Sequence, residues 1–327
     1  MQTCGNKCPD FERVLGIPQH EGENMQTCGN KCPDFERVLG IPQHEGENMQ
    51  TCGNKCPEIS VIMSIYNEPE EYLRRSIESI LNQTFKDFEF IIILDNPKNE
   101  IARNIIEEYS LKDERIISVK NEENIGVTKS LNKGLSIAKG EFIAKMDADD
   151  ISHPKRFEKQ VNFLNKNNEY ELCGTKAYFI DENGKILKNM SLTINNNLTS
   201  YDEIKQNIVK YNPFIHSSLM FKKRILNKIG LYDENFKLAE DYDFLLRVCS
   251  KYKCCILPEK LIYYRVNKKG LSISKSKILS NYAIKAKYNA VFRYGYPKCH
   301  AIYLIISCLS LLIPPKAKQY LIKYMVK

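Results

Sequence analysis

The sequence lacks several features that would place it in a familiar class of protein. It has no run of about 18 apolar residues or more, so a membrane-spanning helix is not predicted. Its N-terminus is polar and has no apolar central region, so a secretory signal peptide is not predicted either. No basic strip is interleaved with aromatic residues, which argues against nucleic acid as a partner.

Paired cysteine spacing is also missing from the chain beyond residue 57. Six cysteines occur there: Cys173, Cys249, Cys254, Cys255, Cys299 and Cys308. Without a secretory signal, such cysteines indicate reduced, mostly buried thiols. The sequence therefore predicts a cytoplasmic protein.

Charge is unevenly distributed along the chain. The 327 residues are 43% apolar, which is enough for a sizeable core, and they carry a net charge of +8. Residues 1–56 hold five Lys/Arg and eight Asp/Glu, a net charge of −3, which leaves +11 for the rest. A basic body favours an anionic partner such as a nucleotide, a phosphate or an acidic membrane face.

The N-terminal part of the chain is a tandem repeat. Residues 1–24 recur unchanged as 25–48, and a partial third copy follows. Each copy carries a Cys-x-x-x-Cys pair, but a structural zinc site needs a matching second pair, so metal binding is the minor interpretation. The copies are rich in Gly, Pro, Asn and Glu, which predicts a weakly ordered appendage over 1–56.

From residue 58 onward, apolar segments alternate with amphipathic ones. The expected strands are 59–65, 88–94, 115–119 and 142–146, and the expected helices are 70–85, 101–111, 127–138 and 153–165. Strands that are apolar throughout and alternate with helices predict an α/β fold. Its sheet should be mostly parallel, with helices on both faces.

The pattern becomes mixed after residue 165. We expect strands at 171–179, 216–221, 254–257 and 261–266, a hairpin turn at 181–184, and helices at 201–210 and 238–247. This half suits an acceptor-binding region that is added to a nucleotide-binding half.

Polar side chains follow three of the first four strands. Tyr66, Asn67 and Glu68 follow the first strand, Asp95 the second, and the run Asp147-Ala148-Asp149-Asp150 the fourth. Ligands of parallel sheets bind beyond the carboxyl ends of the strands. Crowded carboxylates favour a divalent cation such as Mn²⁺ or Mg²⁺, which can in turn hold a diphosphate. An acidic helix cap is the alternative for the last group.

These motifs resemble the inverting glycosyltransferases of family 2, which have the GT-A fold. The matching segments are SVIMSIYNE at 60–68, Asp95, NIGVTKSLNKGLSIAKGEFIAKMDADDISHPKRFEKQ at 124–160, NPFIHSSLMFKK at 212–223 and AEDYDFLLR at 239–247. The resemblance covers about residues 58–266, and the nearest subgroup builds bacterial capsule, exopolysaccharide or lipopolysaccharide. One departure is Leu-Asp-Asn-Pro at 94–97, where the family often has Asp-Asp-Gly-Ser.

The resemblance also divides the chain into domains. It implies a GT-A domain over 57–270, with a nucleotide half at 58–150 and an acceptor half at 151–270. The repeat precedes this domain, and a helical tail at 271–327 follows it.

On the nucleotide side, the resemblance implies that Tyr66 stacks on the base and that Ser64 and Glu68 line the same pocket. Asp95 would accept from a base N–H, which suits uracil or thymine. A packed loop aromatic and a turn former are the structural alternatives for Tyr66 and Asp95.

For the acidic run, the resemblance implies that Asp149 holds the metal. Asp147 would contact the ribose, the sugar, or the metal through water, and Asp150 would cap the next helix. Lys129 and Arg156 are candidate phosphate partners, with a solvated helix face as the alternative.

On the acceptor side, Glu240 and Asp241 begin a helix, where acidic residues also stabilise the helix dipole. The resemblance implies that Asp241 is the general base and Glu240 an acceptor contact, with Asp243 as the second candidate for the base. His216 would contact the acceptor or a phosphate.

The sequence thus predicts an inverting, metal-dependent transferase that moves a sugar from a nucleotide diphosphate, with UDP favoured, to a glycan or lipid-linked acceptor. A sugar-phosphate nucleotidyltransferase is the alternative, but it should have a Gly-rich basic loop where this chain has Tyr-Asn-Glu-Pro. A non-catalytic nucleotide- or metal-binding protein is a third interpretation. Intact carboxylates at both the metal and base positions argue against it.

The C-terminal tail is apolar and then basic. Residues 301–313 are too short to span a bilayer, and 316–327 place lysines opposite apolar residues. The pattern predicts an interfacial anchor at the inner face of the cell membrane. A helix pair packed on the domain is the alternative.

Overall fold

The computed structural model describes residues 56–187, 198–266 and 276–312. The chain divides into two units, Met1–Gly53 and Asn54–Lys327, and all described residues belong to the second unit. The predictions for the N-terminal repeats and for the basic C-terminal segment lie outside the described residues.

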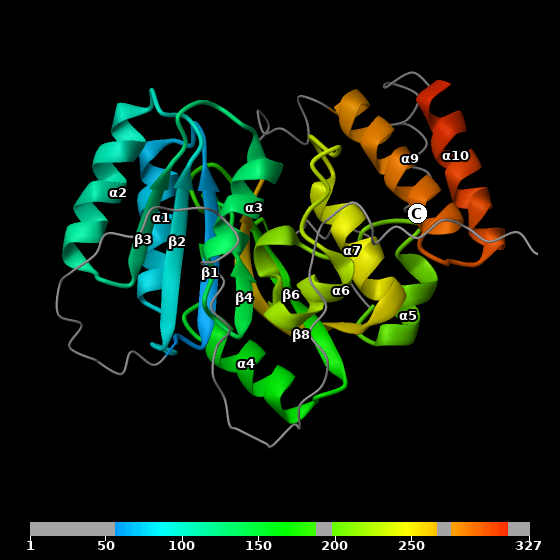
Figure 1. Ribbon diagram of the computed structural model, residues 1–327, viewed down its shortest axis with the longest axis horizontal. Helices are drawn as coiled ribbons and strands as arrows, with labels where there is room; N and C mark the ends of the chain where they lie inside the picture. The colour runs from blue at the N-terminus through cyan, green and yellow to red at the C-terminus, as the bar shows by residue number, and fades with distance from the viewer. Residues whose placement is uncertain (1–55, 188–197, 267–275, 313–327) are drawn as a thin grey trace, which may run out of the picture. The chain divides into compact units, whose positions relative to one another are not determined.

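Four parallel strands form the first half of the sheet, in the order β3-β2-β1-β4 (Figure 1). They are β1 (Ile59–Ile65), β2 (Phe88–Leu94), β3 (Ile116–Lys120) and β4 (Phe142–Lys145). β1 and β2 are buried along almost their whole length, since helices cover both faces. The expected parallel sheet is confirmed for this half.

Two cores lie on opposite faces of the sheet. The first contains α1 (Glu70–Leu81), α2 (Glu100–Lys112) and α4 (Arg156–Lys166), and the second contains α3 (Val127–Ile137), α5 (Tyr201–Asn207), α7 (Glu240–Lys251) and α9 (Ser276–Phe292). The division follows the alternation of side chains along β1, where Val61 and Met63 belong to the first core and Ile62 to the second.

The second half of the sheet is mixed, as predicted. It continues with β7 (Met220–Lys222), β6 (Tyr170–Ile180), β8 (Lys253–Arg265) and β5 (Ile151–Ser152). β7 is antiparallel to both β4 and β6, whereas β6 and β8 run parallel. The single turn α6 (Leu226–Ile229) follows β7.

The predicted strand 216–221 is wrong in its first half. His216–Ser218 form a 3-10 helix, and β7 starts only at Met220. The Ser218 hydroxyl donates to the carbonyl of Ile215 and accepts from the amide of Thr175. Such side-chain bonds to the backbone compete with a strand ladder, which explains why the chain turns here.

The two strands predicted at 254–257 and 261–266 are parts of one strand, β8. Its pairing with β6 skips Pro258 and Glu259. Because proline cannot donate to a strand ladder, it is tolerated at such an irregularity. The apolar pattern marked the two paired segments but not their continuity.

Two helix boundaries also differ from the prediction. α1 ends at Leu81, because the chain beyond it binds the segment after β5, with the Gln83 side chain donating to the carbonyl of His153. α4 begins only at Arg156, because residues 151–152 pair with β8. Neither change moves the sheet edge at which the strands end.

The six cysteines of this part are free thiols, as predicted. Cys173, Cys249, Cys254 and Cys255 are buried, whereas Cys299 and Cys308 are exposed. The prediction of buried cysteines therefore holds in the sheet and in α7 but not for the two C-terminal cysteines.

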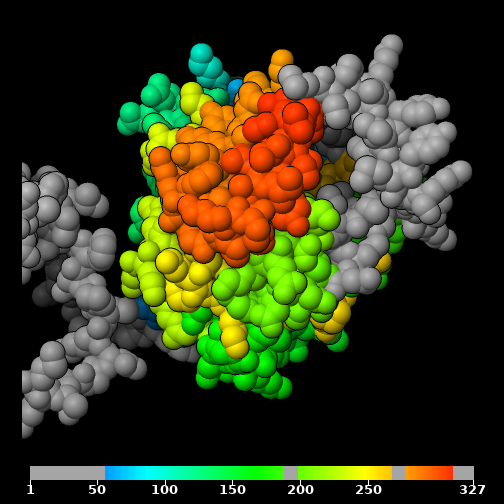
Figure 2. Space-filling model, turned by 90° about the vertical axis from the view of Figure 1, so that its right-hand side faces the viewer, coloured from blue at the N-terminus to red at the C-terminus, as the bar shows by residue number. Residues whose placement is uncertain are grey.

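The C-terminal helices α9 and α10 (Ala301–Leu312) lie side by side (Figure 2, orange and red). α9 packs on α7, and the Tyr296 hydroxyl just beyond it donates to the carbonyl of Leu246. The pair is thus packed on the domain. In the described part of the chain, no helix has the length and apolarity that crossing a membrane requires.

Candidate active site

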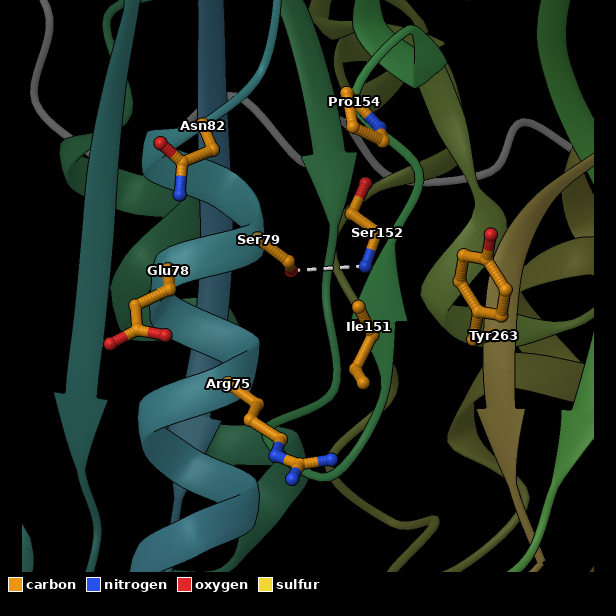
Figure 3. Close-up of a pocket in the computed structure, with 8 residues that line it drawn as sticks. All are labelled: Arg75, Glu78, Ser79, Asn82, Ile151, Ser152, Pro154 and Tyr263. Atoms are coloured by element: carbon orange, nitrogen blue, oxygen red, sulfur yellow. Dashed lines mark hydrogen bonds between the residues drawn. The ribbon is translucent and has the colours of Figure 1, made fainter. Parts of the chain in front are cut away.

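A groove of about 310 Å³ lies between α1 and the β5–β8 edge of the sheet (Figure 3). It is lined by Arg75, Glu78, Ser79, Asn82, Ile151, Ser152, Pro154 and Tyr263. The Ser79 hydroxyl accepts from the amide of Ser152 across it, so this contact joins α1 to the sheet. None of the residues predicted for catalysis, nucleotide binding or metal binding lines the groove, and the candidate site lies elsewhere.

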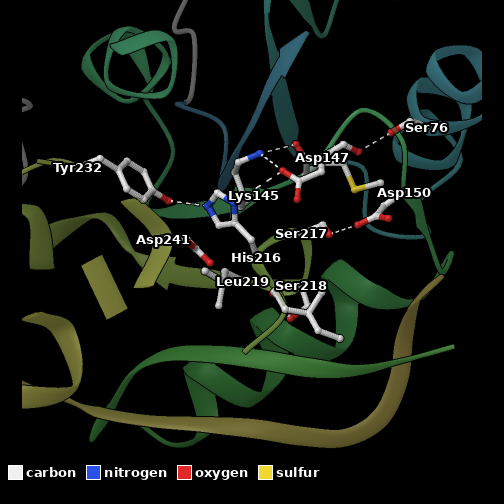
Figure 4. A network of polar contacts seen from close by, with 12 residues as sticks. Ser76, Lys145, Asp147, Asp150, His216, Ser217, Ser218, Leu219, Tyr232 and Asp241 are labelled. Carbon is white, nitrogen blue, oxygen red and sulfur yellow. Dashed lines mark hydrogen bonds and ion pairs between the residues drawn. The ribbon is translucent and has the colours of Figure 1, made fainter. Parts of the chain in front are cut away.

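The predicted residues gather at the carboxyl edge of the parallel strands. β1 and β2 end in register, with Ile65 opposite Leu94, so Tyr66 and Asp95 begin neighbouring loops. The acidic run follows β4, which pairs with β1 on the other side. In Figure 4, His216 and Asp241 lie close to this run, although they come from the second half of the chain.

A buried lysine controls the charge of Asp147. Lys145 is 3% exposed, and its ammonium group donates to the Met146 carbonyl at 2.7 Å and to Asp147 Oδ1 at 2.6 Å. Nδ1 of His216 lies 3.7 Å from the same oxygen. Burial alone would raise the pKa of Asp147, but Lys145 and His216 outweigh it and lower the pKa to about 2. Asp147 is therefore ionised at neutral pH.

Asp149 has the opposite environment. Burial raises the pKa of Asp149 to about 7, and the neighbouring carboxylates of Asp147 and Glu68 add to the shift. Burial also raises the pKa of Glu68. A bound cation would relieve this repulsion between carboxylates.

Arg265, at the end of β8, holds the loop that contains Asp149. Its Nε donates to the Asp149 carbonyl at 2.8 Å, and Nη1 donates to the carbonyls of Asp181 and Glu182. Nη2 is buried and has no hydrogen-bond partner among the described residues. Leaving such a group unpaired is costly, and an anionic group bound beside Asp149 would satisfy it.

Asp150 is not the helix cap that the sequence suggested. One of its oxygens accepts from the amide of Arg265 at 2.8 Å, and the other accepts from the Ser217 hydroxyl. α4 begins only at Arg156 and has no side-chain cap. Asp150 instead joins the acidic run to β8 and to the 3-10 helix at His216.

Arg156 is likewise not available to a phosphate, contrary to the prediction. It is fully buried, and its Nη2 donates to the carbonyls of Lys145 at 2.8 Å and Leu219 at 3.2 Å, while Nε donates to Gln160. Burial lowers the pKa of Arg156 to about 9, so it stays charged at neutral pH. Its role is to tie β4 to the segment before β7. Lys129, the other candidate, is exposed on α3.

The start of α7 supplies a second pair of carboxyl groups. Ala239 precedes the helix with φ of 59°, a left-handed conformation that costs a non-glycine residue about 1–2 kcal/mol. Burial raises the pKa of Glu240 to about 8, and Asp241 and Asp147 add to the shift. Oδ2 of Asp241 accepts from the side-chain amide of Asn212 at 3.2 Å. Strained backbone beside buried carboxyl groups is typical of functional sites.

His216 lies between Asp147 and Asp241 (Figure 4). Its Nδ1 faces Asp147, and its Nε2 is hydrogen bonded to the Tyr232 hydroxyl at 3.2 Å. Burial lowers the pKa of His216, while Asp147 and Asp241 oppose the shift. The ring therefore lies between the acidic run and the start of α7.

Asp243, the second candidate for the general base, is not available for that role. It is 0% exposed, and Oδ2 accepts from Nε of Arg247 at 2.9 Å. Oδ1 accepts from the Tyr294 hydroxyl at 2.7 Å. Both oxygens are used, and they join α7 to the segment after α9.

Asp95 makes more hydrogen bonds within the protein than the sequence suggested. It is buried and accepts from the Asn121 side chain and from the amides of Ile125 and Gly126. Asp95 thus holds the loop before α3. Because a carboxylate offers about four accepting positions, one position remains.

The loop after β1 is the most exposed part of the site. Tyr66 is 45% exposed, and its amide donates to Glu68 Oε2 at 2.8 Å. Ser64, at the end of β1, is half-buried. An exposed ring at a strand end, anchored through its own backbone, can receive a planar ligand group.

Comparison with known proteins identifies the family. The family model for glycosyl transferase family 2 matches residues 60–230. The chain belongs to this family. The resemblance carried by the motifs is confirmed, and the protein is a glycosyltransferase.

This transferase is similar to several known proteins. It is 46% identical over 232 residues to an uncharacterized glycosyltransferase of Methanocaldococcus jannaschii. The matched residues are 70% of this chain and 78% of that protein. It is 32% identical over 270 residues to the amylovoran biosynthesis glycosyltransferase AmsE of Erwinia amylovora, with 80% and 96% covered. The solved structure of S. aureus TarS with UDP-GlcNAc matches with a TM-score of 0.60 at 19% identity, over 74% of this chain and 69% of that one. This likeness confirms the expected GT-A fold.

The carboxylates of the transferase suit a divalent cation. Asp147 and Asp149 offer oxygen donors, and the part of the chain that is described contains no group of three or more His, Cys, Asp or Glu able to hold a metal. Mg²⁺ is usually held by one or two carboxylates, with phosphate oxygens and water in the other positions. The unpaired Nη2 of Arg265 fits a diphosphate beside such an ion.

Sequence reasoning missed three residues of the site: Lys145, Tyr232 and Arg265. Lys145 had a signal, because a lysine inside an apolar strand is seldom buried without a partner. Tyr232 and Arg265 had none, since their partners lie far away in the sequence.

Proposed function

We propose that this protein is an inverting, metal-dependent transferase that moves a sugar from a UDP-sugar to a glycan or lipid-linked acceptor in cell-surface polysaccharide synthesis. The observation that carries the proposal is that two acidic pairs come close together. His216 lies beside Asp147 and within electrostatic range of Asp241, and the charges of Asp241 and Asp147 both act on Glu240. The relatives support the substrate class. AmsE is named for amylovoran biosynthesis, and TarS was crystallised with UDP-GlcNAc.

The loops after β1 and β2 would bind the nucleotide. Tyr66 would stack on the base, and Ser64 and Glu68 would line the same pocket. Asp95 would use its remaining acceptor position for a base N–H, while its other bonds keep the loop before α3 in place.

Asp149, with Asp147 beside it, would hold Mn²⁺ or Mg²⁺. The bound metal would supply Lewis-acid stabilisation of the charge on the leaving diphosphate. Asp149 gives up its proton readily near neutral pH, since its pKa is about 7, and Lys145 keeps Asp147 ionised. Arg265 Nη2 would donate to a phosphate oxygen.

On the acceptor side, Asp241 would be the general base. Inversion needs a carboxylate on the face opposite the leaving group, where it takes the proton of the acceptor hydroxyl as the new glycosidic bond forms. Glu240, with a pKa of about 8, holds its own proton at pH 7, so it suits a hydrogen bond to the acceptor rather than the role of base. His216 would contact the acceptor or a phosphate.

We place the transferase in the cytoplasm, at the inner face of the membrane when its acceptor is lipid-linked. The free state of the described cysteines supports a reducing compartment.

Calorimetric titration of the full chain with UDP tests this proposal. Binding should require Mn²⁺, and Asp149→Asn should weaken it by at least about tenfold. Asp202→Asn, at an exposed position on α5, is the matched control and should bind as the unchanged protein does. If UDP fails, dTDP and GDP are the next nucleotides. No binding of any of the three would overturn the proposal.

A further inference from the structure

The apolar side of α10 faces outward, which is the reverse of an ordinary surface helix. Four large aliphatic residues recur at intervals of three and four and are 51–56% exposed; they are Ile302, Ile305, Ile306 and Leu309. We call these four residues the α10 face. A surface helix normally turns such a stripe toward the core.

The orientation of α10 is set by its contacts with the rest of the protein. The buried Lys287 of α9 donates to the Ser307 hydroxyl at 2.9 Å and to the Lys210 carbonyl at 2.9 Å. Tyr303 packs against the second core. Because Ser307 and Tyr303 face inward, the aliphatic stripe is left outside.

Part of the exposed surface of α9 is also apolar. The rings of Tyr288 and Phe292, both about half exposed, lie 4.8 Å apart, and the Lys298 ammonium lies 4.7 Å from the Phe292 ring. Figure 2 shows the two helices side by side on the surface. Aliphatic and aromatic side chains with neighbouring lysines are typical of helices that lie in a membrane interface.

Charge in this part of the chain has one sign. Residues 260–327 contain 14 lysine and arginine residues and no aspartate or glutamate. Since the whole chain carries +8, the residues before 260 carry a net charge of −6. The basic excess therefore belongs to the C-terminal part of the sequence, which includes α10, and positive charge of this kind attracts anionic lipid headgroups.

We propose that the α10 face docks on a membrane surface that contains anionic lipids, with α10 lying in the plane of the interface. The helix has 12 residues, and at about 1.5 Å per residue it cannot cross a hydrocarbon layer of about 30 Å. Insertion of the four aliphatic side chains supplies the apolar contribution to binding, and the lysines and arginines supply the electrostatic one. This inference deepens the membrane location given in the proposed function and does not depend on the sugar-transfer chemistry.

Vesicle sedimentation with the full chain tests the docking. The protein should bind vesicles of phosphatidylglycerol and phosphatidylcholine and should bind pure phosphatidylcholine much less. The double variant Ile305→Gln, Leu309→Gln should bind the anionic vesicles at least about tenfold less. Raising NaCl from about 0.1 M to about 0.5 M should weaken binding several-fold. Leu111→Gln removes a 90% exposed leucine on α2 and should change nothing.

Four results would overturn the proposal. The first is that the unchanged protein does not bind anionic vesicles. The second is that the double variant binds them as well as the Leu111→Gln control does. Dimers that become monomers in the double variant would mean that a second copy covers the face. A melting temperature several degrees lower in the variant would mean that the chain's own residues 313–327 cover it. UDP titration of the same proteins separates this test from the proposed function, since the double variant should bind UDP normally.

Discussion

The carboxyl groups of the site differ widely in how they hold a proton. Lys145 and His216 lower the pKa of Asp147 to about 2, whereas burial raises that of Asp149 to about 7 and that of Glu240 to about 8. Burial acts on all three, so the difference lies in which charged neighbours each one has. Of these three groups, Asp147 is therefore ionised at pH 7, whereas Asp149 and Glu240 are poised to gain or lose a proton.

Replacing the proposed base should separate turnover from nucleotide binding. Asp241→Asn has a side chain of the same size, and its carbonyl oxygen can still accept from Asn212, but it cannot act as a base. We expect transfer to fall by about 100-fold or more, in line with general-base catalysis, with UDP affinity unchanged. Sugar-transfer kinetics and calorimetry on the same preparation check both parts. Near-normal turnover would show that another group is the base.

Glu240 should make stability depend on pH in a definite direction. Its pKa is about 8 in the folded protein and about 4.3 in an unfolded chain, so folding takes up a proton between these values. The stabilisation is complete below about pH 4 and is lost as the pH rises through about 8. Glu240→Gln has no such carboxyl group, so it does not lose this stability as the pH rises. The melting temperature of the variant should therefore rise relative to that of the unchanged protein between about pH 5 and about pH 9. Glu122→Gln, which is exposed, is the control, and parallel curves for all three proteins would contradict the assignment.

At the scale of elements, α7 connects the candidate site to the C-terminal helices. Its first turn carries Glu240 and Asp241, and two residues further along, Asp243 accepts from Arg247 and Tyr294. The helix therefore presents one carboxylate pair to the site, while a third carboxylate fixes the helix to the segment after α9. A similar division holds in the acidic run, where Asp149 faces like charges and Asp150 is bound to β8.

Loss of the buried Asp243 charge should reduce stability without removing nucleotide binding. Asp243→Asn leaves Arg247 without its ionic partner, and breaking a buried pair in this way costs about 3 kcal/mol. Urea unfolding should show the loss, and UDP titration in the absence of urea should be normal. Tyr294→Phe removes only the hydroxyl and should cost about 1 kcal/mol. Equal stability of Asp243→Asn and the unchanged protein would mean that α7 is held by other contacts.

At the scale of the whole molecule, the site is where a parallel half-sheet meets a mixed one. β4 is paired on one side with the parallel strand β1 and on the other with the antiparallel strand β7. The acidic run after β4 therefore lies next to His216, which comes directly before β7. Ligands that contact both halves should stabilise the fold as a unit.

Nucleotide and metal together should stabilise the full chain against unfolding. At a free UDP concentration of about 100 times its dissociation constant, with Mn²⁺ present, the expected gain is about 2.7 kcal/mol. Thermal unfolding followed with and without UDP, Mn²⁺ and EDTA checks this. Removal of the metal by EDTA should return the melting temperature to that of the free protein, and Asp149→Asn should show no gain. A gain that persists in EDTA would contradict metal dependence.

Local sequence was enough to predict the alternating strands and helices, the sheet edge that carries the site, and the family. Apolar runs and helical periodicity are properties of neighbouring residues, so they can be recognised without knowledge of the fold. The positions of Asp147, Asp149, Glu240 and Asp241 followed from motifs, and in the structure Asp147 lies close enough to act on the pKa of both Asp149 and Glu240.

Only the tertiary structure separated the functional charges from the structural ones. Arg156 and Asp243 looked like site residues in the sequence but are buried against Leu219 and Tyr294. Lys145 looked like a strand residue but binds Asp147. The reason is physical, because burial and hydrogen-bond partners depend on segments that are distant in the chain and meet only when it folds.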